Sequence, residues 1–220
     1  MKTAMSRPEE TDRLQDLGRA SIQIIHDLKN QLNGLKLYAT FLRRRIEKSE
    51  RPDDEQETIG KLISGLDRAA EDLSTIVKYG QPVELKKQSG FEVDKVLRSV
   101  CSTFNGQIVT HADSEAVQGN FDHFKLTDAL KWLCMGALKH RQPADEGDGE
   151  IAVTTKLAAN NSTAVIEWSG LRQLDHDPFR SFAGSDEIKL ALAAKIVEAH
   201  GGSAKFMDQK FIVELPLEYS

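Results

Sequence analysis

The sequence predicts a two-domain protein, in which an N-terminal all-α helical hairpin dimerises into a four-helix bundle and a C-terminal α+β domain follows. Two long segments with apolar residues at helical spacing come first, and shorter strand-like and helical segments replace them from about Val83 onward. Gly80 and Pro82 end the second long segment. We therefore place the two domains at residues 1–82 and 83–220.

The first predicted helix runs from about Glu9 to Lys48. At about 100° per residue its apolar side chains form one stripe, and His26 lies roughly opposite the centre of that stripe. The stripe consists of Leu14, Leu17, Ser21, Ile24, Leu28, Leu32, Leu35, Ala39, Leu42 and Ile46. His26 is therefore predicted to lie outside the core, on a helix that needs a partner to cover its apolar side.

The partner helix is predicted to follow Pro52, where Asp53 can cap its N-terminus and Gln56 occupies the reciprocal capping-box position. Its apolar residues recur at the same spacing: Ile59, Leu62, Ile63, Leu66, Ala69, Leu73, Ile76 and Val77. Two antiparallel helices still leave apolar surface exposed along their length. Dimerisation into a four-helix bundle is the simplest way to cover that surface.

The second domain is predicted to alternate helices and strands. Periodicity indicates helices over 91–104, 122–140 and 186–200, and strands over 151–157, 163–168 and 211–217. This mixture, with no long repeated βαβ pattern, is typical of an α+β domain.

The composition excludes several classes of protein. Of the 220 residues, 40% are hydrophobic and 29% charged, and the net charge of −5 argues against nucleic-acid binding. No window has the roughly 18 apolar residues of a spanning helix, and the N-terminus lacks a signal peptide, so we expect a cytoplasmic protein without membrane insertion. Cys101 and Cys134 have no partner at metal-ligand or redox spacing, which predicts buried, reduced thiols.

Several motifs follow one another in an informative order. His26-Asp27-Leu28-Lys29-Asn30 comes first, then the helix 126–140, the sequence Ile196-Val197-Glu198-Ala199-His200-Gly201-Gly202 and the closing strand 211–217. Over nearly its full length the chain thus resembles the core of bacterial sensor histidine kinases. The first motif resembles their phosphoacceptor box, in which an acid follows the histidine directly and Thr or Asn follows four residues after it. The resemblance implies a histidine-kinase-ATPase-like sandwich for the second domain.

The chain departs from that family at the nucleotide site. Trp132 and Gly136 stand where the family has asparagines that contact magnesium and phosphate, and neither has a side-chain oxygen. Trp168 replaces the adenine-binding aspartate. The glycine-rich turn reads Glu187-Ile188-Lys189-Leu190-Ala191, which places side chains where the backbone should approach the phosphates. The segment from Gly170 to Glu187 is also too short for a nucleotide lid.

These losses predict a degenerate, pseudokinase-like domain that holds neither ATP nor a metal. The pattern then resembles the dimeric histidine phosphotransferases of bacterial sporulation and cell-cycle phosphorelays, which pair a bundle hairpin with a degenerate kinase-like domain. For this group the resemblance implies a homodimer that exchanges phosphoryl groups with response-regulator receiver domains, downstream of a hybrid histidine kinase. Magnesium, where needed, would belong to the receiver.

The phosphoacceptor box assigns three roles. His26 is the predicted phosphoacceptor, because transfer from a phosphoaspartate needs an exposed imidazole with a free Nε2 lone pair. Asp27 is predicted to accept a hydrogen bond from Nδ1–H and so to fix the ring's tautomer and orientation. For Asn30, the resemblance implies positioning of water during phosphatase action, and the alternative is a surface residue that only flanks the site.

A mixed strip surrounds the histidine on the helical wheel. Ile22, Asn33 and Leu37 fall within about 40° of His26, and Phe41 lies at about 60°. Together with Lys29, this strip is the predicted docking surface for a receiver domain. The alternative is that the bundle interface widens to bury the same residues.

Three functions remain open from the sequence. The favoured one is an ATP-independent histidine phosphotransferase that relays phosphoryl groups between receiver aspartates through His26. The second is an autophosphorylating histidine kinase with an aberrant ATP site. The third is a noncatalytic dimeric scaffold or antagonist that binds a response regulator or a kinase without accepting phosphate.

Overall fold

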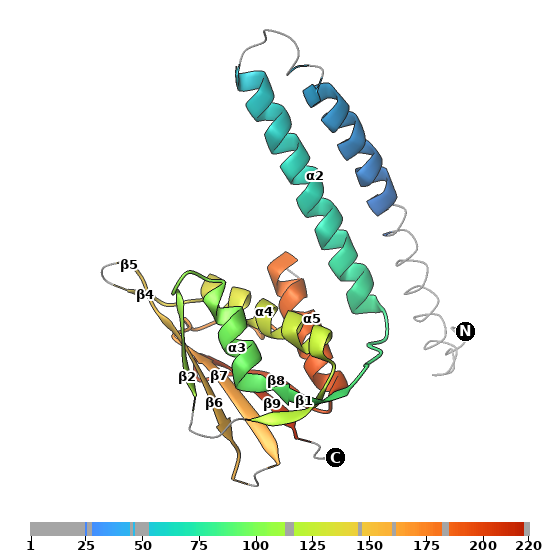
Figure 1. Cartoon of the computed structure of the whole chain (residues 1–220). Helices are drawn as coiled ribbons and strands as arrows, with labels where there is room; N and C mark the ends of the chain where they lie inside the picture. Colours follow the sequence, from blue (N-terminus) through green and yellow to red (C-terminus); the bar gives the residue numbers. More distant parts are fainter. Residues whose placement is uncertain are drawn as a thin grey trace, which may run out of the picture. The chain divides into compact units, whose positions relative to one another are not determined.

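A computed structural model describes residues 25, 28–44, 46, 53–112, 117–144, 147–159, 162–181 and 185–217. The chain divides into two compact units, Met1–Gln81 and Pro82–Ser220. The first unit contains two long helices and the second a sheet with helices (Figure 1). None of the described helices is long and apolar enough to cross a bilayer.

The first unit pairs the helix over residues 28–44 with α2 (Asp53–Gly80), and the two lie side by side (Figure 1). Lys36 forms an ion pair with Asp67 of α2 at 2.5 Å, so this side of the first helix faces α2. Ala39, on the same side, is only 3% exposed, and Leu32 and Ile46 are half-buried. The apolar spacing of both helices thus produces a packed seam between them.

The described part of the predicted apolar stripe, from Leu28 to Ile46, divides into two parts. Leu32, Ala39 and Ile46 belong to the seam against α2, whereas Leu28, Leu35 and Leu42 are 44%, 54% and 53% exposed. The exposed leucines recur every seven residues and therefore form a continuous line along the helix. A single chain leaves this line uncovered.

The second unit is built on a five-stranded mixed sheet in the order β2-β6-β7-β9-β8. The strands are β2 (Ile108–Ala112), β6 (Ile151–Leu157), β7 (Thr163–Ser169), β8 (Ser203–Met207) and β9 (Lys210–Pro216). The β2–β6 pair is parallel and the other pairs are antiparallel. In β6, β7 and β9 alternate residues are buried, so one face of the sheet forms the core and the other faces solvent.

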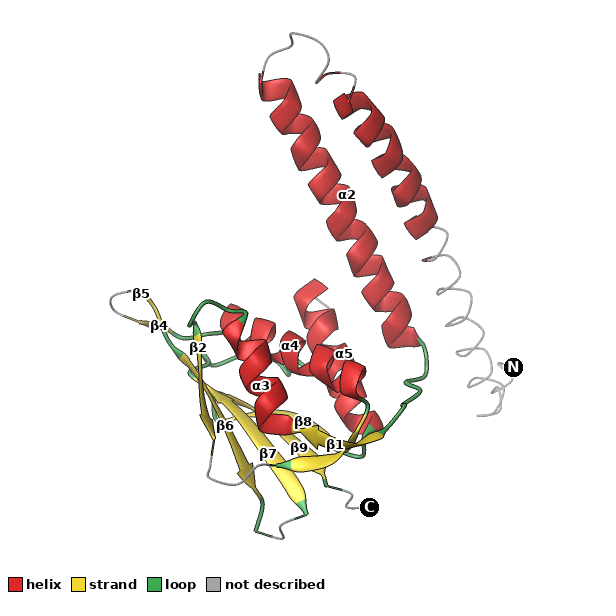
Figure 2. Cartoon of the chain, viewed as in Figure 1, coloured by secondary structure: helices red, strands yellow, loops and turns green. Residues whose placement is uncertain are grey.

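Three helices cover the core face of this sheet: α3 (Val93–Ser102), α4 (His123–Lys139) and α5 (Ser185–Ala199) (Figure 2). Helix α5 is buried on nearly every side, which explains why it is hydrophobic all round. A two-stranded antiparallel sheet of β1 (Gln88–Glu92) and β3 (Gln118–Phe121) leads into α3 and α4. A short hairpin of β4 (Pro143–Ala144) and β5 (Gly147–Asp148) precedes β6.

The predicted helix over 91–104 begins too early. Phe91 and Glu92 belong to β1, and α3 starts at Val93, because the backbone N–H of Val93 bonds to the carbonyl of Val117 beside the β1–β3 pair. The sequence analysis does not predict strands β1, β2, β3, β4, β5 and β8. Strand β6 has the predicted bounds, and α4, α5, β7 and β9 differ from the predicted ranges by at most one residue at either end.

A buried polar node joins the N-terminus of α4 to the C-terminus of α5. The Asp122 carboxylate caps α4 by accepting the Lys125 N–H at 3.0 Å, and it also accepts the Lys86 N–H at 2.8 Å. Burial acts to raise the pKa of Asp122, but these two hydrogen bonds hold the pKa below its usual value. The Asp122 N–H in turn donates to His200 Nε2 at 3.0 Å, and His200 Nδ1 lies 2.8 Å from the Ile196 carbonyl. One neutral tautomer of His200 satisfies both contacts.

His140, at the other end of α4, is buried in a different way. It is 2% exposed, and its two ring nitrogens have no hydrogen-bond partner among the described residues. Its ring packs edge-on against Phe211. Burial lowers the pKa of His140, and the cations Arg172 and Lys139 lower it further. Burial likewise lowers the pKa of His200.

We predict that the second unit loses stability as the pH falls below about 6.5, the ordinary pKa of histidine. Both histidines have lower pKa values in the folded chain, so the unfolded chain binds more protons below that pH, and the loss continues until each folded pKa is reached. His140→Phe should make the free energy of unfolding depend less on pH and leave it unchanged at pH 8. The reason is that Phe fills a similar space, cannot be protonated, and removes no hydrogen bond that the described structure shows for the His140 ring.

The matched variant His200→Phe should instead lose about 2 kcal/mol at pH 8, because it leaves the Asp122 N–H and the Ile196 carbonyl buried without this partner. Urea unfolding followed by circular dichroism at pH 8 and pH 5.5 measures both effects. Equal losses from the two variants at pH 8 would contradict this account.

Candidate functional site

One face of the first helix carries the described members of the predicted site. Asn30, Asn33, Leu37 and Phe41 are spaced at helical intervals of three or four residues, and all four are exposed. The exposed fractions are 55% for Leu37 and 56% for Phe41. We call these four residues the Asn30–Phe41 strip. It presents two amide side chains and two large apolar side chains to solvent, away from the seam with α2.

His26, Asp27 and Ile22 lie outside the described residues, so their predicted roles stay predictions. Lys29 is half-buried and shares the side of Leu32 and Lys36, which faces α2. Its position therefore differs from that of the Asn30–Phe41 strip. The exposed leucines Leu28, Leu35 and Leu42 form a third line on the helix, distinct from both.

The positions that resemble nucleotide-binding motifs meet in the second unit, between α4 and α5. Gly136 of α4 is buried, and the side chain of Leu190 of α5 fills the space that a side chain at Gly136 would need. An asparagine at Gly136 would overlap Leu190. Trp132, the other motif position on α4, is half-buried. This part of α4 therefore packs against α5 and offers no oxygen for a hard cation.

Trp168 occupies the position of the predicted adenine ligand and is fully buried. Its indole Nε1–H lies 3.4 Å from the Cys134 sulfur of α4 and donates to it. The indole thus joins the core between β7 and α4. A large aromatic ring contributes there mainly by burial.

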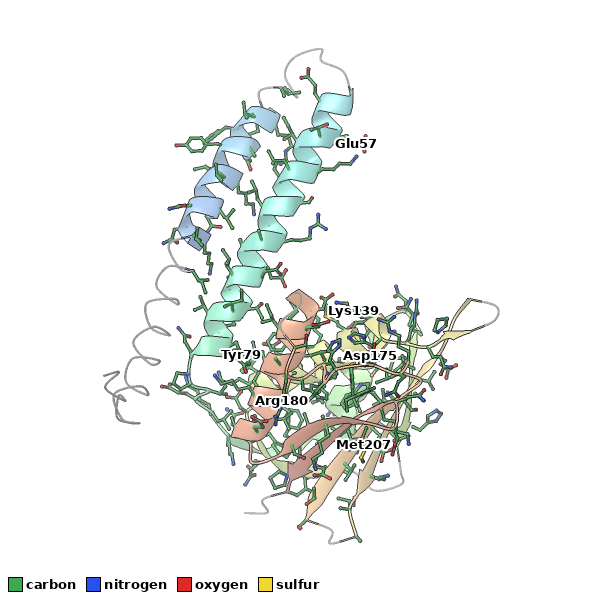
Figure 3. The ribbon with its side chains drawn as sticks, turned by 180° about the vertical axis from the view of Figure 1, so that it is seen from behind. Glu57, Tyr79, Lys139, Asp175, Arg180 and Met207 are labelled. Atoms are coloured by element: carbon green, nitrogen blue, oxygen red, sulfur yellow. The ribbon has the colours of Figure 1, made fainter. Side chains whose placement is uncertain are left out.

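Glu187 places a carboxylate at the start of α5, where the resemblance predicts the first lost glycine. It is 8% exposed, accepts a hydrogen bond from the Ser181 hydroxyl, and lies 3.7 Å from His176 Nε2. Its neighbour Asp186 pairs with Lys139, labelled in Figure 3, at 3.4 Å. Acidic side chains at a helix N-terminus satisfy the positive end of the dipole that would otherwise attract phosphate.

A short segment, residues 171–181, replaces the expected nucleotide lid. The Arg172 N–H donates to the His140 carbonyl at 2.8 Å, and Phe179 is buried against Phe211 with ring centroids 5.1 Å apart. The segment is thus fixed at both ends by the core. A cavity of about 290 Å³ lies next to it, lined by Phe179, Arg180, Phe206 and Met207 among others. Of the positions that resemble family motifs, Glu198 lines this cavity, whereas Trp132, Gly136, Trp168 and Glu187 do not.

Sequence reasoning missed two groupings in this unit. The Ser181–Glu187–His176 contacts depend on how the 171–181 segment returns to α5. Cys101 and Cys134 are 33 positions apart, yet their sulfurs lie 3.8 Å from each other because α3 packs beside α4. The prediction of buried thiols without a disulfide is confirmed, because both cysteines are free and buried, but their proximity in space was not predicted. No local pattern could have revealed either grouping.

Comparisons with solved structures show which known proteins have a similar fold. No family model and no curated protein matches the sequence. Full-length ShkA in complex with AMPPNP has a TM-score of 0.71 at 17% identity, over 90% of this chain and 45% of ShkA. The histidine kinase ThkA in complex with the response regulator protein TrrA has a TM-score of 0.61 at 20% identity, over 94% of this chain and 64% of that chain.

The histidine kinase AdeS of Acinetobacter baumannii has a TM-score of 0.58 at 17% identity, over 88% of this chain and 98% of that chain. This chain therefore spans less than half of ShkA and slightly under two thirds of ThkA. At these identities the likeness concerns the fold. The mixed sheet with its helices resembles the ATPase-like domain of histidine kinases.

We predict that Gly136→Val destabilises the second unit by about 2–3 kcal/mol, because the new side chain must displace buried Leu190. Gly65→Val is the matched control: Gly65 also lies within a helix, but a Cβ there meets nothing within 4 Å. Valine and glycine have similar helix propensities, so the control should change stability by less than about 0.5 kcal/mol. Urea unfolding measures both. An unchanged free energy of unfolding in Gly136→Val would contradict this prediction, because it would mean that α4 and α5 leave room for a side chain at this position.

Proposed function

We propose that this chain is a dimeric histidine phosphotransferase of a two-component phosphorelay. His26 accepts a phosphoryl group from the aspartate of one receiver domain and passes it to the aspartate of another, without ATP, in the cytoplasm. The observation that supports this proposal is the packing of three positions that resemble the family's nucleotide-binding motifs: Leu190 packs against Gly136, Trp168 is fully buried, and Glu187 accepts a hydrogen bond from Ser181.

The proposed transfer uses the imidazole alone as nucleophile. His26 Nε2 attacks the phosphorus of the receiver's aspartyl phosphate in line, so that the P–N bond forms as the P–O bond breaks. Asp27 holds the Nδ1 proton and the ring's orientation. Attack by the second receiver's aspartate reverses these steps, and Asn30 positions water if the phosphoryl group is hydrolysed. Any magnesium ion is bound by the receivers.

The Asn30–Phe41 strip supports a receiver as partner. Its two exposed apolar side chains, Leu37 and Phe41, lie on the face where the helical wheel places His26, so an apolar helix of a receiver could pack there while its aspartate reaches the histidine. ThkA, which shares the fold, was crystallised with a response regulator. We further propose that a hybrid histidine kinase supplies the first receiver.

We also propose that the line of Leu28, Leu35 and Leu42 is covered by a second copy of the chain. A line of leucines at seven-residue spacing is typical of a helix–helix seam, and the other line of the stripe already packs against α2. Pairing two hairpins along this line produces the predicted four-helix bundle.

The first test is transfer of label from phosphorylated receiver domains. Wild type should gain acid-labile label from at least one receiver in a panel and return it to a second receiver, whereas His26→Gln should gain none. Binding of unphosphorylated receiver to His26→Gln, measured by calorimetry, controls for folding. Receiver binding without label on wild type would reject the relay and favour the scaffold.

The second test concerns the dimer. Leu35→Asp should convert the dimer to a monomer, because it places a charge in the proposed seam. Leu37→Asp is a matched control, since Leu37 is equally exposed in the single chain but lies on the Asn30–Phe41 strip. It should remain dimeric and lose at least about tenfold in transfer rate. Size-exclusion chromatography with light scattering measures the mass. If only Leu37→Asp dissociated the dimer, the Asn30–Phe41 strip, and not the line of Leu28, Leu35 and Leu42, would be the dimer seam.

A further inference from the structure

The two cysteines of the chain meet in the core of the second unit. Cys101 lies in the last turn of α3 and Cys134 in the middle of α4, and they are 3% and 0% exposed. Their sulfurs are 3.8 Å apart, within hydrogen-bond distance for thiols. The chain has no other cysteine. Two thiols of different helices are therefore held in contact, and no third cysteine in the chain could form a disulfide with either of them.

The surroundings make the two thiols chemically different. The Trp168 indole N–H donates to the Cys134 sulfur, which also lies within hydrogen-bond distance of the Cys101 sulfur, where either thiol can be the donor. The hydrogen bond with Cys134 lowers the pKa of Cys101 against the opposing effect of burial. The same bond and burial raise the pKa of Cys134. Cys101 is thus the thiol that ionises first and acts as nucleophile, with Cys134 as its hydrogen-bond donor.

Cys101 can become accessible to a small oxidant because it lies next to the C-terminus of α3. Helix α3 ends at Ser102, one residue after Cys101, and residues 103–107 form a turn. Asn105 and Gly106 in this turn both have positive φ, at 51° and 77°. A helix terminus opens locally at much lower cost than the core of the domain. Opening of this last turn exposes Cys101 while α4 keeps Cys134 in place.

We propose that Cys101 and Cys134 form a peroxide-oxidisable dithiol that closes into an intrachain disulfide between α3 and α4. The Cys101 thiolate attacks one oxygen of hydrogen peroxide, the O–O bond breaks, and a sulfenic acid forms with release of water after protonation. The Cys134 sulfur then attacks the sulfenic sulfur, the S–O bond breaks, and a second water leaves as the S–S bond forms. Each peroxide thus oxidises two thiols and is reduced to two waters.

The disulfide needs only a small movement of the end of α3. The sulfurs must approach from 3.8 Å to about 2.05 Å, the length of an S–S bond. Since Trp168 contacts Cys134 directly, its fluorescence should change when the bond forms. The bond also closes a loop within the domain, so the oxidised chain should melt at a higher temperature than the reduced chain.

The test uses the full chain in its folded state. It is treated with hydrogen peroxide, quenched with catalase, denatured, alkylated with N-ethylmaleimide and weighed by mass spectrometry. The expected product is unalkylated, lighter by two hydrogen atoms, monomeric in mass on a non-reducing denaturing gel, and alkylated at both cysteines after dithiothreitol. Peptide mapping should join Cys101 to Cys134.

Two single variants separate the roles of the thiols. In Cys134→Ala, Cys101 should stop at the sulfenic acid and be trapped by dimedone. In Cys101→Ala, Cys134 should react at least about tenfold more slowly than Cys101 does in the other variant. Two freely alkylated cysteines in treated wild type would overturn the proposal and leave inert buried thiols. Covalent dimers, or equal reactivity of the two single cysteines, would overturn it as well.

Discussion

The second unit depends on the close packing of two antiparallel helices, α4 and α5, against the sheet. They are joined at three levels. At one end the Asp122 N–H bonds to His200, at the other Lys139 pairs with Asp186, and between them Leu190 packs into the space left by Gly136. The central contact is possible only because Gly136 has no side chain. It lets α4 and α5 pack closely at this position.

The same contact determines what the surrounding residues can do. With Leu190 against α4, Trp168 fills the core beneath and holds Cys134, while Glu187 is turned toward Ser181 and His176. Each of these side chains is satisfied by the protein itself. Removing one of these side chains would leave its partners buried and unpaired, so they are expected to change together.

Most long elements could be predicted from the sequence, because their periodicity is strong. Helices α4 and α5 and strands β6, β7 and β9 were found to within a residue at either end. The short strands were missed because their stability comes from partners distant in the chain: β2 pairs with β6, and β1 pairs with β3 across a bulge near Gly90. The seven-residue line of Leu28, Leu35 and Leu42 was visible in the sequence. Its separation from Leu32, Ala39 and Ile46 was not, since only the position of α2 distinguishes the two.

Of the candidate site, the exposure of some residues could be predicted, and the roles of His26, Asp27 and Ile22 stay predictions. The exposure of Asn30, Asn33, Leu37 and Phe41 agrees with the face predicted from the helical wheel, whereas Lys29 lies with the seam. The departures from the family motifs at Gly136, Trp168 and Glu187 could be found in the sequence, but the residues that contact these positions could not. Leu190, Ser181 and His176 acquire their roles only through packing.

We propose that phosphate reaches this chain from a receiver and never from ATP. The most direct measurement is isothermal calorimetry of magnesium-ATP with this chain, paired with incubation in labelled ATP and analysis of the His26 peptide. We predict no heat of binding at millimolar nucleotide and no label. Saturable binding together with label on His26 would contradict the account and establish an autophosphorylating kinase.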